Sequence, residues 1–246
     1  MERRQRQRNL SIGRDRFMIG HWQADPEIAY LSSRRPADQI KPENLRACLD
    51  KLRQMGFKAV MTPALHPDEA IVFLTNGFQQ VDSLAVLGHS LRTLSPPLRT
   101  PGSKLHLRRG RRSDLPVIFD LDNRAFPPNW RLDEMSLREA RTATTHSRFR
   151  VAELRDNGSE PMTVGYAIAG RTGSMGFLQR LATDPNWSGR GVGSTLTNDA
   201  LEWARSNRCT SLLVNTQKTN RRALALYESL GFERTKTQLT VLRCSL

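Results

Sequence analysis

Two helical faces stand out in the alternation of apolar and polar residues in the second half of the chain. Apolar side chains recur at positions i, i+3, i+4 and i+7 over residues 223–230, and a comparable helical spacing recurs over residues 196–204. This spacing places the side chains on one face of a helix. The two sets are Ala223, Leu226, Tyr227 and Leu230, and Leu196, Ala200, Trp203 and Ala204. We therefore expect two amphipathic helices.

Shorter segments of the second half have the pattern of strands and helices separated by turn residues. The expected strands are Leu105 to Arg108, Phe149 to Leu154, Thr163 to Ala169 and Phe177 to Thr183. Helices are expected from a Ser113/Asp114 cap through Ala125 and after Ser136, with turns at Asp156 to Gly158 and at Gly170 to Gly173. The mixture predicts an α/β (α+β) fold.

The chain contains an internal repeat. Alignment of its two Gly-Phe pairs superposes Ala59 to Phe78 on Leu213 to Phe232 without a gap. Val60 then falls on Val214, Thr62 on Thr216 and Phe73 on Tyr227, and one residue of slack brings Leu84 to Leu87 onto Leu239 to Leu242. Both copies predict a strand, a helix, a Gly-Phe turn and a second strand.

A glycine loop distinguishes the second copy from the first. Ser188 to Ser194 has glycines at positions 189, 191 and 193, between a predicted strand and a predicted helix. Without Cβ atoms, successive N–H groups can point at one anion where the helix dipole favours negative charge. The spacing fits neither a Rossmann turn nor a Walker loop; a turn in which glycine only relieves strain is the alternative. The first copy has Pro36 and Pro42 here, which remove donors.

The segment Leu94 to Ser103 is rich in proline and serine and predicts a linker. We therefore divide the chain into a basic flexible tail over residues 1–16, a degenerate half-domain over 17–94, a linker over 95–103 and a second domain over 104–246.

Charge sets this chain apart from an ordinary globular protein. The formal net charge is +14, concentrated in Arg3 to Arg8 and in the acid-free stretch from Arg99 to Arg112. Such charge attracts anions. The tail either associates with nucleic acid or a ribosome, or is a solvated extension; the second stretch lacks the interleaved aromatic residues of a single-strand stacking platform.

Cysteine usage and hydropathy indicate the compartment. Cys48, Cys209 and Cys244 are widely spaced, with no CxxC or histidine pattern, which favours a reducing compartment over disulfides or a metal site. No apolar run approaches the ~20 residues of a membrane span, and Met1 to Arg8 is charged with no apolar segment behind it. We expect a cytoplasmic protein with no metal and no membrane partner, as a monomer or homodimer.

Two blocks of the second half resemble the GCN5-related N-acetyltransferase (GNAT) superfamily. The family's acetyl-CoA signature, Gln/Arg-x-x-Gly-x-Gly/Ala, falls on Ser188 to Gly193, after Leu181 to Pro185. Asn220 to Phe232 matches the pattern Asn-x-x-Ala-x-x-x-Tyr-x-x-x-Gly-Phe. The resemblance extends over Lys104 to Leu246 and, more weakly, over Phe17 to Leu91. It implies a GNAT fold, with a mixed sheet splayed between its fourth and fifth strands and flanked by helices, preceded by a partial GNAT-like repeat.

The resemblance also implies which residues hold acetyl-CoA. Backbone groups of the strand would meet the pantetheine arm, and N–H groups of the loop would meet the pyrophosphate. Asn220 matches a position near the pantetheine, or is a helix N-cap. The expected residues are Leu181, Ala182, Thr183, Ser188, Gly189, Arg190, Gly191, Val192, Gly193, Ser194 and Asn220. Ser188 replaces the usual Gln or Arg, a contact that Arg190 is expected to supply.

By the same resemblance, Tyr227 corresponds to the general acid beside the coenzyme sulfur; core packing is its alternative role. A phenol of pKa ~10 protonating a thiolate of pKa ~8.5 is uphill by ~2 kcal/mol, so hydrogen bonding to the thiolate is the better description. The strand Phe177 to Leu181 has no Glu or Asp, where many relatives keep a base. The base stays open among Gln179, Asn215, a backbone carbonyl, Glu153 and His146.

The resemblance implies that the acceptor is an amine. An α-amine of pKa ~8 is partly neutral at cellular pH, whereas a lysine near ~10.4 must lose ~3 pKa units, or about 4 kcal/mol, so the absence of a carboxylate favours α-amines. Asp122 to Trp130 is similar to the segment that walls the acceptor site of ribosomal-protein alanine N-acetyltransferases. Phe126, Trp130, Gln179 and Asn215 are the expected substrate-binding residues, although both aromatics are equally explained as core.

These features and the resemblance predict a cytoplasmic acetyl-CoA-dependent N-acetyltransferase that acetylates an amine such as the α-amine of a protein N-terminus, with a first half that is structural. One alternative is acetylation of a small amine, such as an amino sugar or a thiol conjugate. The other is a non-catalytic acetyl-CoA sensor that binds nucleic acid or a ribosome through its tail.

Overall fold

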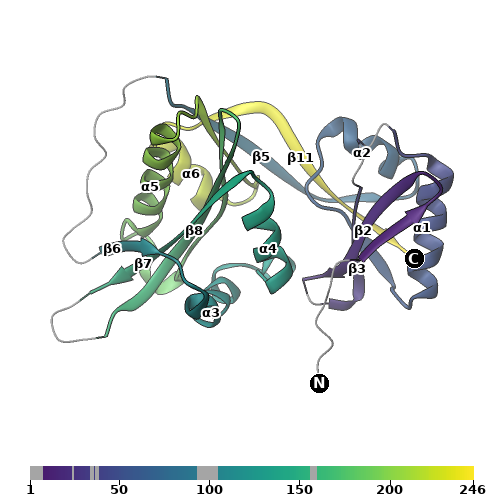
Figure 1. Cartoon of the computed structure of the whole chain (residues 1–246), viewed down its shortest axis with the longest axis horizontal. Helices are drawn as coiled ribbons and strands as arrows, with labels where there is room; N and C mark the ends of the chain where they lie inside the picture. Colours follow the sequence, from purple (N-terminus) through teal and green to yellow (C-terminus); the bar gives the residue numbers. More distant parts are fainter. Residues whose placement is uncertain (1–7, 24, 34–35, 37–38, 93–104, 156–159) are drawn as a thin grey trace. The chain divides into compact units, whose positions relative to one another are not determined.

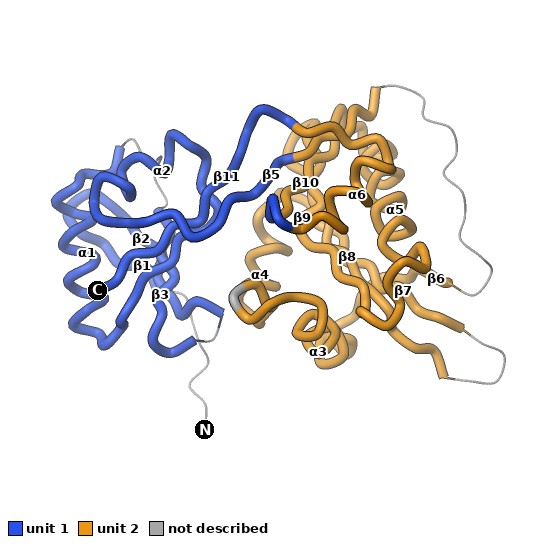
Figure 2. Tube along the Cα trace, turned by 180° about the vertical axis from the view of Figure 1, so that it is seen from behind, with its two compact units in different colours: residues 1–86, 217–219, 235–246 blue, residues 87–216, 220–234 orange. Residues whose placement is uncertain are grey.

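The computed structural model describes residues 8–23, 25–33, 36, 39–92, 105–155 and 160–246. It divides into two compact units: unit 1 comprises residues 1–86, 217–219 and 235–246, and unit 2 comprises residues 87–216 and 220–234 (Figure 2). Three strands contribute residues to both units: β5 (Gln79–Ser90), β11 (Glu233–Ser245) and β10 (Ser211–Gln217), of which only Gln217 lies in unit 1. No single cut in the sequence therefore separates the units.

Unit 1 is a mixed sheet with two helices (Figure 1). Its strands lie in the order β1-β2-β3-β4-β11-β5. Besides β5 and β11, unit 1 contains β1 (Arg8–Ile12), β2 (Asp15–Trp22), β3 (Asp25–Ser33), α1 (Pro42–Gln54), β4 (Ala59–Met61) and α2 (Pro67–Leu74). Strands β3 and β4 are parallel, and β11 is antiparallel to β4. Leu242 and Cys244 of β11 belong to the core of this unit, so the last strand of the chain completes it.

The expected tail over residues 1–16 is wrong for its second half. Arg8–Ile12 forms β1, which pairs antiparallel with β2 from Arg8 opposite Ile19 to Ile12 opposite Asp15. Leu10 and Ile12 pack against the core of unit 1, and this apolar contact holds the segment in the sheet. Arg3 to Arg6 lie outside the described residues.

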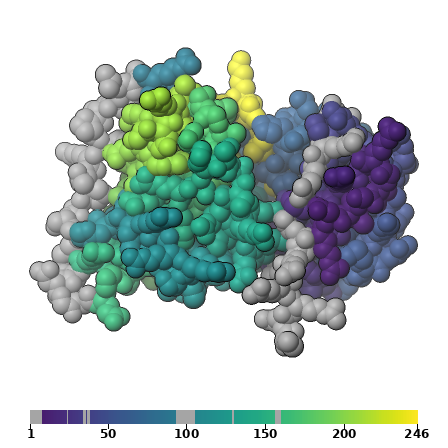
Figure 3. Space-filling model, in the orientation of Figure 1, coloured from purple at the N-terminus to yellow at the C-terminus, as the bar shows by residue number. Residues whose placement is uncertain are grey.

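Unit 2 is a mixed sheet covered by helices on both faces. Its strands lie in the order β5-β10-β9-β8-β7-β6. The elements are β6 (Leu105–Arg109), α3 (Leu115–Ala125), α4 (Glu134–Thr142), β7 (His146–Leu154), β8 (Met162–Thr172), β9 (Met175–Thr183), α5 (Val192–Ser206), β10 (Ser211–Gln217) and α6 (Arg221–Ser229), with single 3-10 turns at Arg112–Asp114, Pro128–Trp130 and Pro185–Trp187. Helices α3 and α4 cover one face, as the teal surface in Figure 3 shows, and α5 covers the other.

Most predicted elements of unit 2 are confirmed, with two differences. Helix α4 begins at Glu134, before the predicted start at Ser136, because Asp133 caps it by accepting from Ser136 N–H at 2.7 Å. Strand β8 runs through Gly170 to Thr172, so the turn is confined to Gly173 and Ser174. The predicted turn at residues 156–158 and the linker at 95–103 lie outside the described residues.

The internal repeat is confirmed by equivalent hydrogen bonds in its two copies. Gly77 and Gly231 have φ angles of 89° and 83°, which glycine adopts without strain. Phe78 N–H donates to Phe73 O at 3.2 Å, and Phe232 N–H donates to Tyr227 O at 3.0 Å. The ring centroids of these two pairs are 5.2 Å and 5.6 Å apart. The Gly-Phe turn therefore has one geometry, built twice.

The domain boundaries expected near residues 94 and 104 stay a prediction. The compact units differ from them at the end of the chain, because residues 235–246 lie in unit 1. Among the described residues, no helix has the length and apolar character needed to span a bilayer.

Candidate active site

The glycine loop between β9 and α5 leaves a row of backbone N–H groups unpaired. Gly189 and Gly191 have φ angles of 75° and 83°, which side chains rarely adopt. Backbone bonding ends with Ser188 N–H donating to Pro185 O at 3.2 Å and resumes with Thr195 N–H donating to Gly191 O at 2.9 Å. Within the described part of the chain, the N–H groups of residues 189–194 have no acceptor. They are free to bind an anion at the N-terminus of α5.

Gly193 marks the point where three segments of the predicted site meet. A Cβ at this position would lie 3.1 Å from Leu226 Cδ2 of α6 and 3.6 Å from Thr183 Oγ1 of β9. The third glycine is thus explained by close packing, whereas the first two are explained by backbone conformation. The structure brings together the loop, the end of β9 and the helix that carries Tyr227.

Strands β9 and β10 separate beyond their first half. They pair in parallel only from Met175 opposite Ser211 to Leu178 opposite Val214, although β9 continues to Thr183 and β10 to Gln217. A bulge at Gln179 lies at the point of separation, since Ile168 pairs with Arg180 and Ala169 with Leu178. Bulges bend strands and increase their twist. The expected splay between the fourth and fifth strands is therefore present.

Among the strands of the described residues, none pairs with the second backbone edge of Leu181, Ala182 and Thr183, because of the splay. Their other edge pairs with β8, from Ala167 opposite Leu181 to Gly165 opposite Thr183. These three residues can therefore offer backbone groups to an extended ligand lying between β9 and β10, which is the arrangement that the resemblance implies for pantetheine.

Charged side chains fix the segment that leads into the loop. Asp184 accepts from Arg124 Nη2 at 2.8 Å and from Asn186 N–H at 2.9 Å. Burial alone would raise the pKa of Asp184, but these hydrogen bonds outweigh it and hold the pKa below its usual range. At the tip of the loop, the Arg190 guanidinium lies over the Trp187 ring, 4.5 Å from its centroid. Arg190 is exposed, so its charge stays available to phosphate groups.

Tyr227 lies on α6 directly after Leu226 and is 4% exposed. Burial raises the pKa of its phenol. The hydroxyl therefore stays protonated at neutral pH, and in this site it can donate a hydrogen bond but is not a phenolate. The ring also packs on Phe232, so the packing role expected as the alternative is present as well.

Asn220 caps α6. Its Oδ1 accepts from Ala223 N–H at 3.1 Å, which confirms the N-cap role. A contact with pantetheine stays a prediction for this residue.

A buried ion pair holds the predicted acceptor wall against β9. Asp122 of α3 is 0% exposed and accepts from Arg180 Nη2 at 2.7 Å and from Leu132 N–H at 2.6 Å. The Tyr166 hydroxyl donates to the same carboxylate. Arg180 Nη2 also donates to Trp130 O at 2.6 Å, and its guanidinium lies over the Phe126 ring at 3.7 Å from the centroid. Both predicted acceptor-site aromatics are therefore fastened to β9 by one arginine.

Gln179 and Asn215 lie at the splay, on β9 and β10 respectively. Gln179 Oε1 is buried and has no hydrogen-bond partner among the described residues. A Cβ on Gly170 would lie 2.8 Å from this oxygen and would overlap Thr144 Oγ1, so glycine makes room there. Asn215 is exposed, one residue beyond the last residue of β10 paired with β9. Their contacts with substrate stay predictions.

The remoter candidates for the base are placed elsewhere. Glu153 of β7 accepts from Arg108 Nε at 2.6 Å and from Arg155 Nη2 at 3.4 Å, and these bonds tie it to the β6 edge. His146 is exposed at the start of β7, opposite Arg171. The base stays unassigned.

Sequence reasoning missed the group formed by Asp122, Tyr166 and Arg180. A signal was present, because Asp122 follows Leu121 on the apolar face of α3 defined by Ile118 and Leu121, where a charge has to be paired. Arg180 likewise interrupts an apolar strand between Leu178 and Ala182. Neither position could be paired with the other from the chain alone, since 58 residues separate them.

In unit 1, a carboxylate of the chain itself lies at the start of α1, the helix that corresponds to α5 of unit 2. Asp15 is 2% exposed, and its Oδ2 accepts from Lys41 N–H at 3.2 Å and from Asn44 Nδ2 at 2.8 Å, at the start of α1. A carboxylate there satisfies the positive end of the helix dipole. Among the described residues at this terminus, the backbone N–H of Lys41 therefore already has an acceptor, unlike the N–H groups of residues 189–194 in unit 2.

Comparison with known proteins agrees with this geometry. Residues 115–232 match the acetyltransferase (GNAT) family. This segment belongs to the GNAT family. It contains β7–β10, the glycine loop and Tyr227, so the GNAT domain carries all the predicted site residues.

Relatives of the GNAT domain act on different acceptors, as their names state. A mycothiol acetyltransferase from Acidimicrobium ferrooxidans is 27% identical over 202 residues, which cover 78% of this chain and 57% of the relative. An N-alpha-acetyltransferase 30 from Xenopus laevis is 36% identical over 61 residues, which cover 25% of this chain and 22% of the relative. The chain thus spans little more than half the length of the first.

Solved structures share the fold over nearly the whole chain. A tandem GNAT protein from the clavulanic acid biosynthesis pathway has a TM-score of 0.67 at 13% identity, covering 94% of this chain and 78% of that one. A GCN5-related N-acetyltransferase from Sphaerobacter thermophilus has a TM-score of 0.59 at 15% identity, with coverages of 93% and 76%. These likenesses show the GNAT fold, and the tandem protein supports its repetition.

Proposed function

We propose that this protein is an acetyl-CoA-dependent N-acetyltransferase. The observation that carries the proposal is the meeting of an unpaired N–H row with a splayed pair of strands at Gly193. The row suits the pyrophosphate of acetyl-CoA, and the splay suits its extended pantetheine arm. The tyrosine of α6 follows the residue that contacts Gly193, on the helix that closes this junction.

The transfer proceeds by direct attack in a ternary complex. The amine lone pair forms a bond to the acetyl carbonyl carbon, the carbon–sulfur bond breaks, and coenzyme A leaves as a thiolate. The amine proton passes to solvent, and the thiolate is protonated in turn. Burial makes proton donation by Tyr227 still more costly than the ~2 kcal/mol of an ordinary phenol and thiol, so the hydroxyl stabilises the thiolate by a hydrogen bond.

The acceptor we favour is the α-amine of a protein N-terminus. The strand β9 carries no carboxylate to deprotonate a lysine, and an α-amine of pKa ~8 is partly neutral without help. Because Arg180 neutralises Asp122, the wall beside Phe126 presents no unpaired carboxylate that would favour a cationic acceptor such as a lysine side chain. The similarity to N-alpha-acetyltransferase 30 over 61 residues supports this choice.

A small-molecule amine is the second candidate. The similarity to mycothiol acetyltransferase favours it, because that alignment extends over 202 residues of the chain.

Coenzyme A release measured with three acceptor sets tests the proposal. The sets are peptides with free N-termini, the same peptides N-terminally blocked but containing lysine, and small amino-sugar or cysteine-conjugate amines. We expect turnover with the free N-termini and little with the blocked peptides. Turnover only with small amines would support the second candidate. Acetyl-CoA at about 100 times its Kd stabilises a protein by ~2.7 kcal/mol, so the absence of any thermal shift would contradict both.

A further inference from the structure

Four segments of unit 2 meet at the end of its sheet opposite the glycine loop. Leu91 N–H donates to Thr210 O at 2.9 Å, and Thr210 N–H donates to Ser174 O at 2.8 Å. Thr145 N–H donates to Thr172 Oγ1 at 3.4 Å. These bonds place the end of β5, the start of β10, the β8–β9 turn and the start of β7 side by side. Residues 90–92, 141–148, 171–176 and 205–211 are called the arginine rim below.

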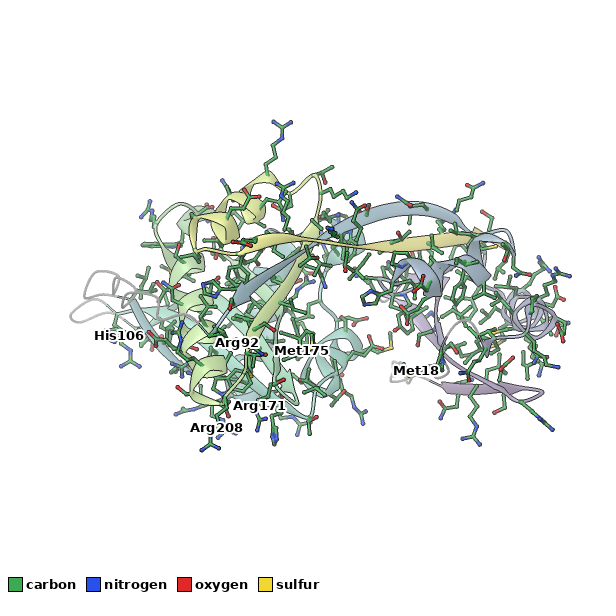
Figure 4. All side chains as sticks on the ribbon, turned by 90° about the horizontal axis from the view of Figure 1, so that it is seen from above. Met18, Arg92, His106, Arg171, Met175 and Arg208 are labelled. Carbon is green, nitrogen blue, oxygen red and sulfur yellow. The ribbon has the colours of Figure 1, made fainter. Side chains whose placement is uncertain are left out.

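The rim contains no Asp or Glu. It carries Arg92, Arg141, Arg148, Arg171, Arg205, Arg208 and His146. Only Arg148 has an acidic partner among the described residues, namely Asp199 at 2.8 Å. Figure 4 labels Arg92, Arg171 and Arg208 in one region of unit 2, beside the exposed Met175. The uncompensated positive charge of the chain therefore gathers at a defined place in the fold, and not only in its N-terminal tail.

The chemistry of the rim fits a phosphate backbone. All its fixed cations are arginines, whose planar guanidinium groups bind phosphates through two parallel hydrogen bonds. Hydroxyl side chains lie between them at Thr144, Thr145, Ser147, Thr172, Ser174 and Thr210. The rim has no Phe, Trp or Tyr, so it lacks the stacking platform with which proteins bind unpaired bases.

We propose that the arginine rim binds the backbone of duplex RNA. The absence of aromatics favours a duplex over a single strand. The wide, shallow minor groove of an RNA duplex displays 2′-hydroxyls within reach of short Ser and Thr side chains. Because β9 begins at the rim with Met175 and ends before the glycine loop with Thr183, RNA and acetyl-CoA occupy opposite ends of the sheet. The inference does not depend on the proposed catalysis.

The test uses the full chain and a short labelled RNA duplex, with affinity measured by fluorescence anisotropy over a salt series. The variant Arg92→Gln/Arg141→Gln/Arg208→Gln removes three exposed charges from the rim. The matched control Arg14→Gln/Arg16→Gln/Arg243→Gln removes three exposed charges from unit 1. Each lost phosphate contact lowers the slope of log K against log salt by about 1, so the rim variant should lose about 2 to 3.

We expect the rim variant to bind the duplex on the order of ten-fold more weakly at physiological salt, with the control close to the unmodified chain. Replacement of the same three arginines by lysine should restore part of the affinity. Equal losses in rim and control variants would overturn the proposal, and so would equal binding to a DNA duplex or to anionic lipid vesicles. Thermal unfolding of each variant, with and without acetyl-CoA, shows whether unit 2 is folded.

Discussion

At the scale of single residues, the buried phenol of Tyr227 determines what kind of catalysis α6 can contribute. A hydroxyl that stays protonated can stabilise a departing thiolate by a hydrogen bond of about 1.5–3 kcal/mol. Tyr227→Phe should therefore lower kcat about 10- to 100-fold, since each 1.4 kcal/mol is a factor of ten. The affinity for acetyl-CoA should change little.

Steady-state kinetics together with acetyl-CoA binding by calorimetry checks this prediction. Tyr227→Leu is a harsher control, because it removes the ring that packs on Phe232 and should also lower stability. Full turnover by Tyr227→Phe would leave the tyrosine with its packing role alone.

Gly191 is the glycine of the loop at which replacement by alanine tests the strain of the backbone. Gly191 has a φ of 83° with open space around it, whereas Gly193 lies in α5 and would meet Leu226 at 3.1 Å. Gly191→Ala should lower the free energy of unfolding by roughly 1–2 kcal/mol, the cost of a left-handed conformation for a residue with a Cβ. Chemical denaturation of Gly191→Ala measures this, with Glu202→Ala as a control at an exposed position of α5. An unchanged midpoint for Gly191→Ala would contradict the strained conformation.

At the scale of elements, the pair Asp122 and Arg180 joins α3 to β9. Removal of one partner of a buried pair typically costs about 3–5 kcal/mol, because the other charge is left without compensation. Asp122→Ala should therefore destabilise the protein by that amount, and Asp122→Leu combined with Arg180→Met should cost less than the two single changes added together. The exposed pair Glu228 and Arg234 of unit 2 is a control expected to contribute under about 1 kcal/mol.

The pair Asp122 and Arg180 should also affect how well the enzyme binds its amine acceptor. Arg180 holds Phe126 and the Trp130 carbonyl, both in the segment expected to wall the acceptor site. Arg180→Lys retains the charge but loses the second hydrogen bond of the fork. We expect its KM for the amine to rise while its Kd for acetyl-CoA stays unchanged. An equal rise in the KM for the amine and in the Kd for acetyl-CoA would show that Arg180 contributes only to the general stability of the fold.

The link between Asp184 and Arg124 connects the entry of the glycine loop to α3 and predicts a pH dependence. The pKa of Asp184 is lowered in the folded state, so its contribution is fully present above the ordinary carboxyl pKa of ~3.9 and is lost as the pH falls through the folded pKa. Asp184→Asn should be less stable at neutral pH and should lose less stability below about pH 4. Urea denaturation across pH checks this; Asp120→Asn, at the exposed partner of Arg124, should retain the unmodified profile.

At the scale of the whole molecule, the sequence predicts the repeat and the glycine loop because each depends on local spacing, whereas the splay is expected only from the resemblance to the GNAT family. Gly77 and Gly231 punctuate two similar segments, and their turns have the same hydrogen bonds. The sharing of β5 and β11 between the units could not be predicted in this way. Strand pairing between distant segments, such as β4 with β11, leaves no period in the sequence.

Long-range polar contacts were missed for the same reason. The carboxylate of Asp122 and the guanidinium of Arg180 each break an apolar pattern, but the pattern does not say which distant charge pairs with which. The base also stays unassigned, because β9 has no carboxylate and the remoter Glu153 is bound by arginines.

The shared strands predict that the second half should not be stable when produced alone. A chain of residues 104–246 lacks Leu87 to Ser90, which belong to unit 2, and lacks β4, the partner of β11. Leu242, which is 0% exposed in the full chain, would then lose its surroundings in the core of unit 1. Exposed apolar strands tend to associate.

We therefore expect residues 104–246 to aggregate or to unfold at a lower temperature than the full chain. Size-exclusion chromatography and thermal unfolding measure both. Co-expression with residues 1–94 should restore a soluble complex. A monomeric fragment as stable as the full chain would show that the first half is dispensable.

The carboxylate of Asp15 means that the two copies of the repeat differ in the source of the anion at the helix N-terminus. An anion that is part of the chain cannot dissociate, so the carboxylate stays at the start of α1 at every concentration of metabolite. The second copy depends for its anion on what the cell supplies, and its stability therefore rises and falls with that supply. The same architecture is thus present twice in one polypeptide, once with a carboxylate of the chain at the helix terminus and once with the terminus open to an external anion.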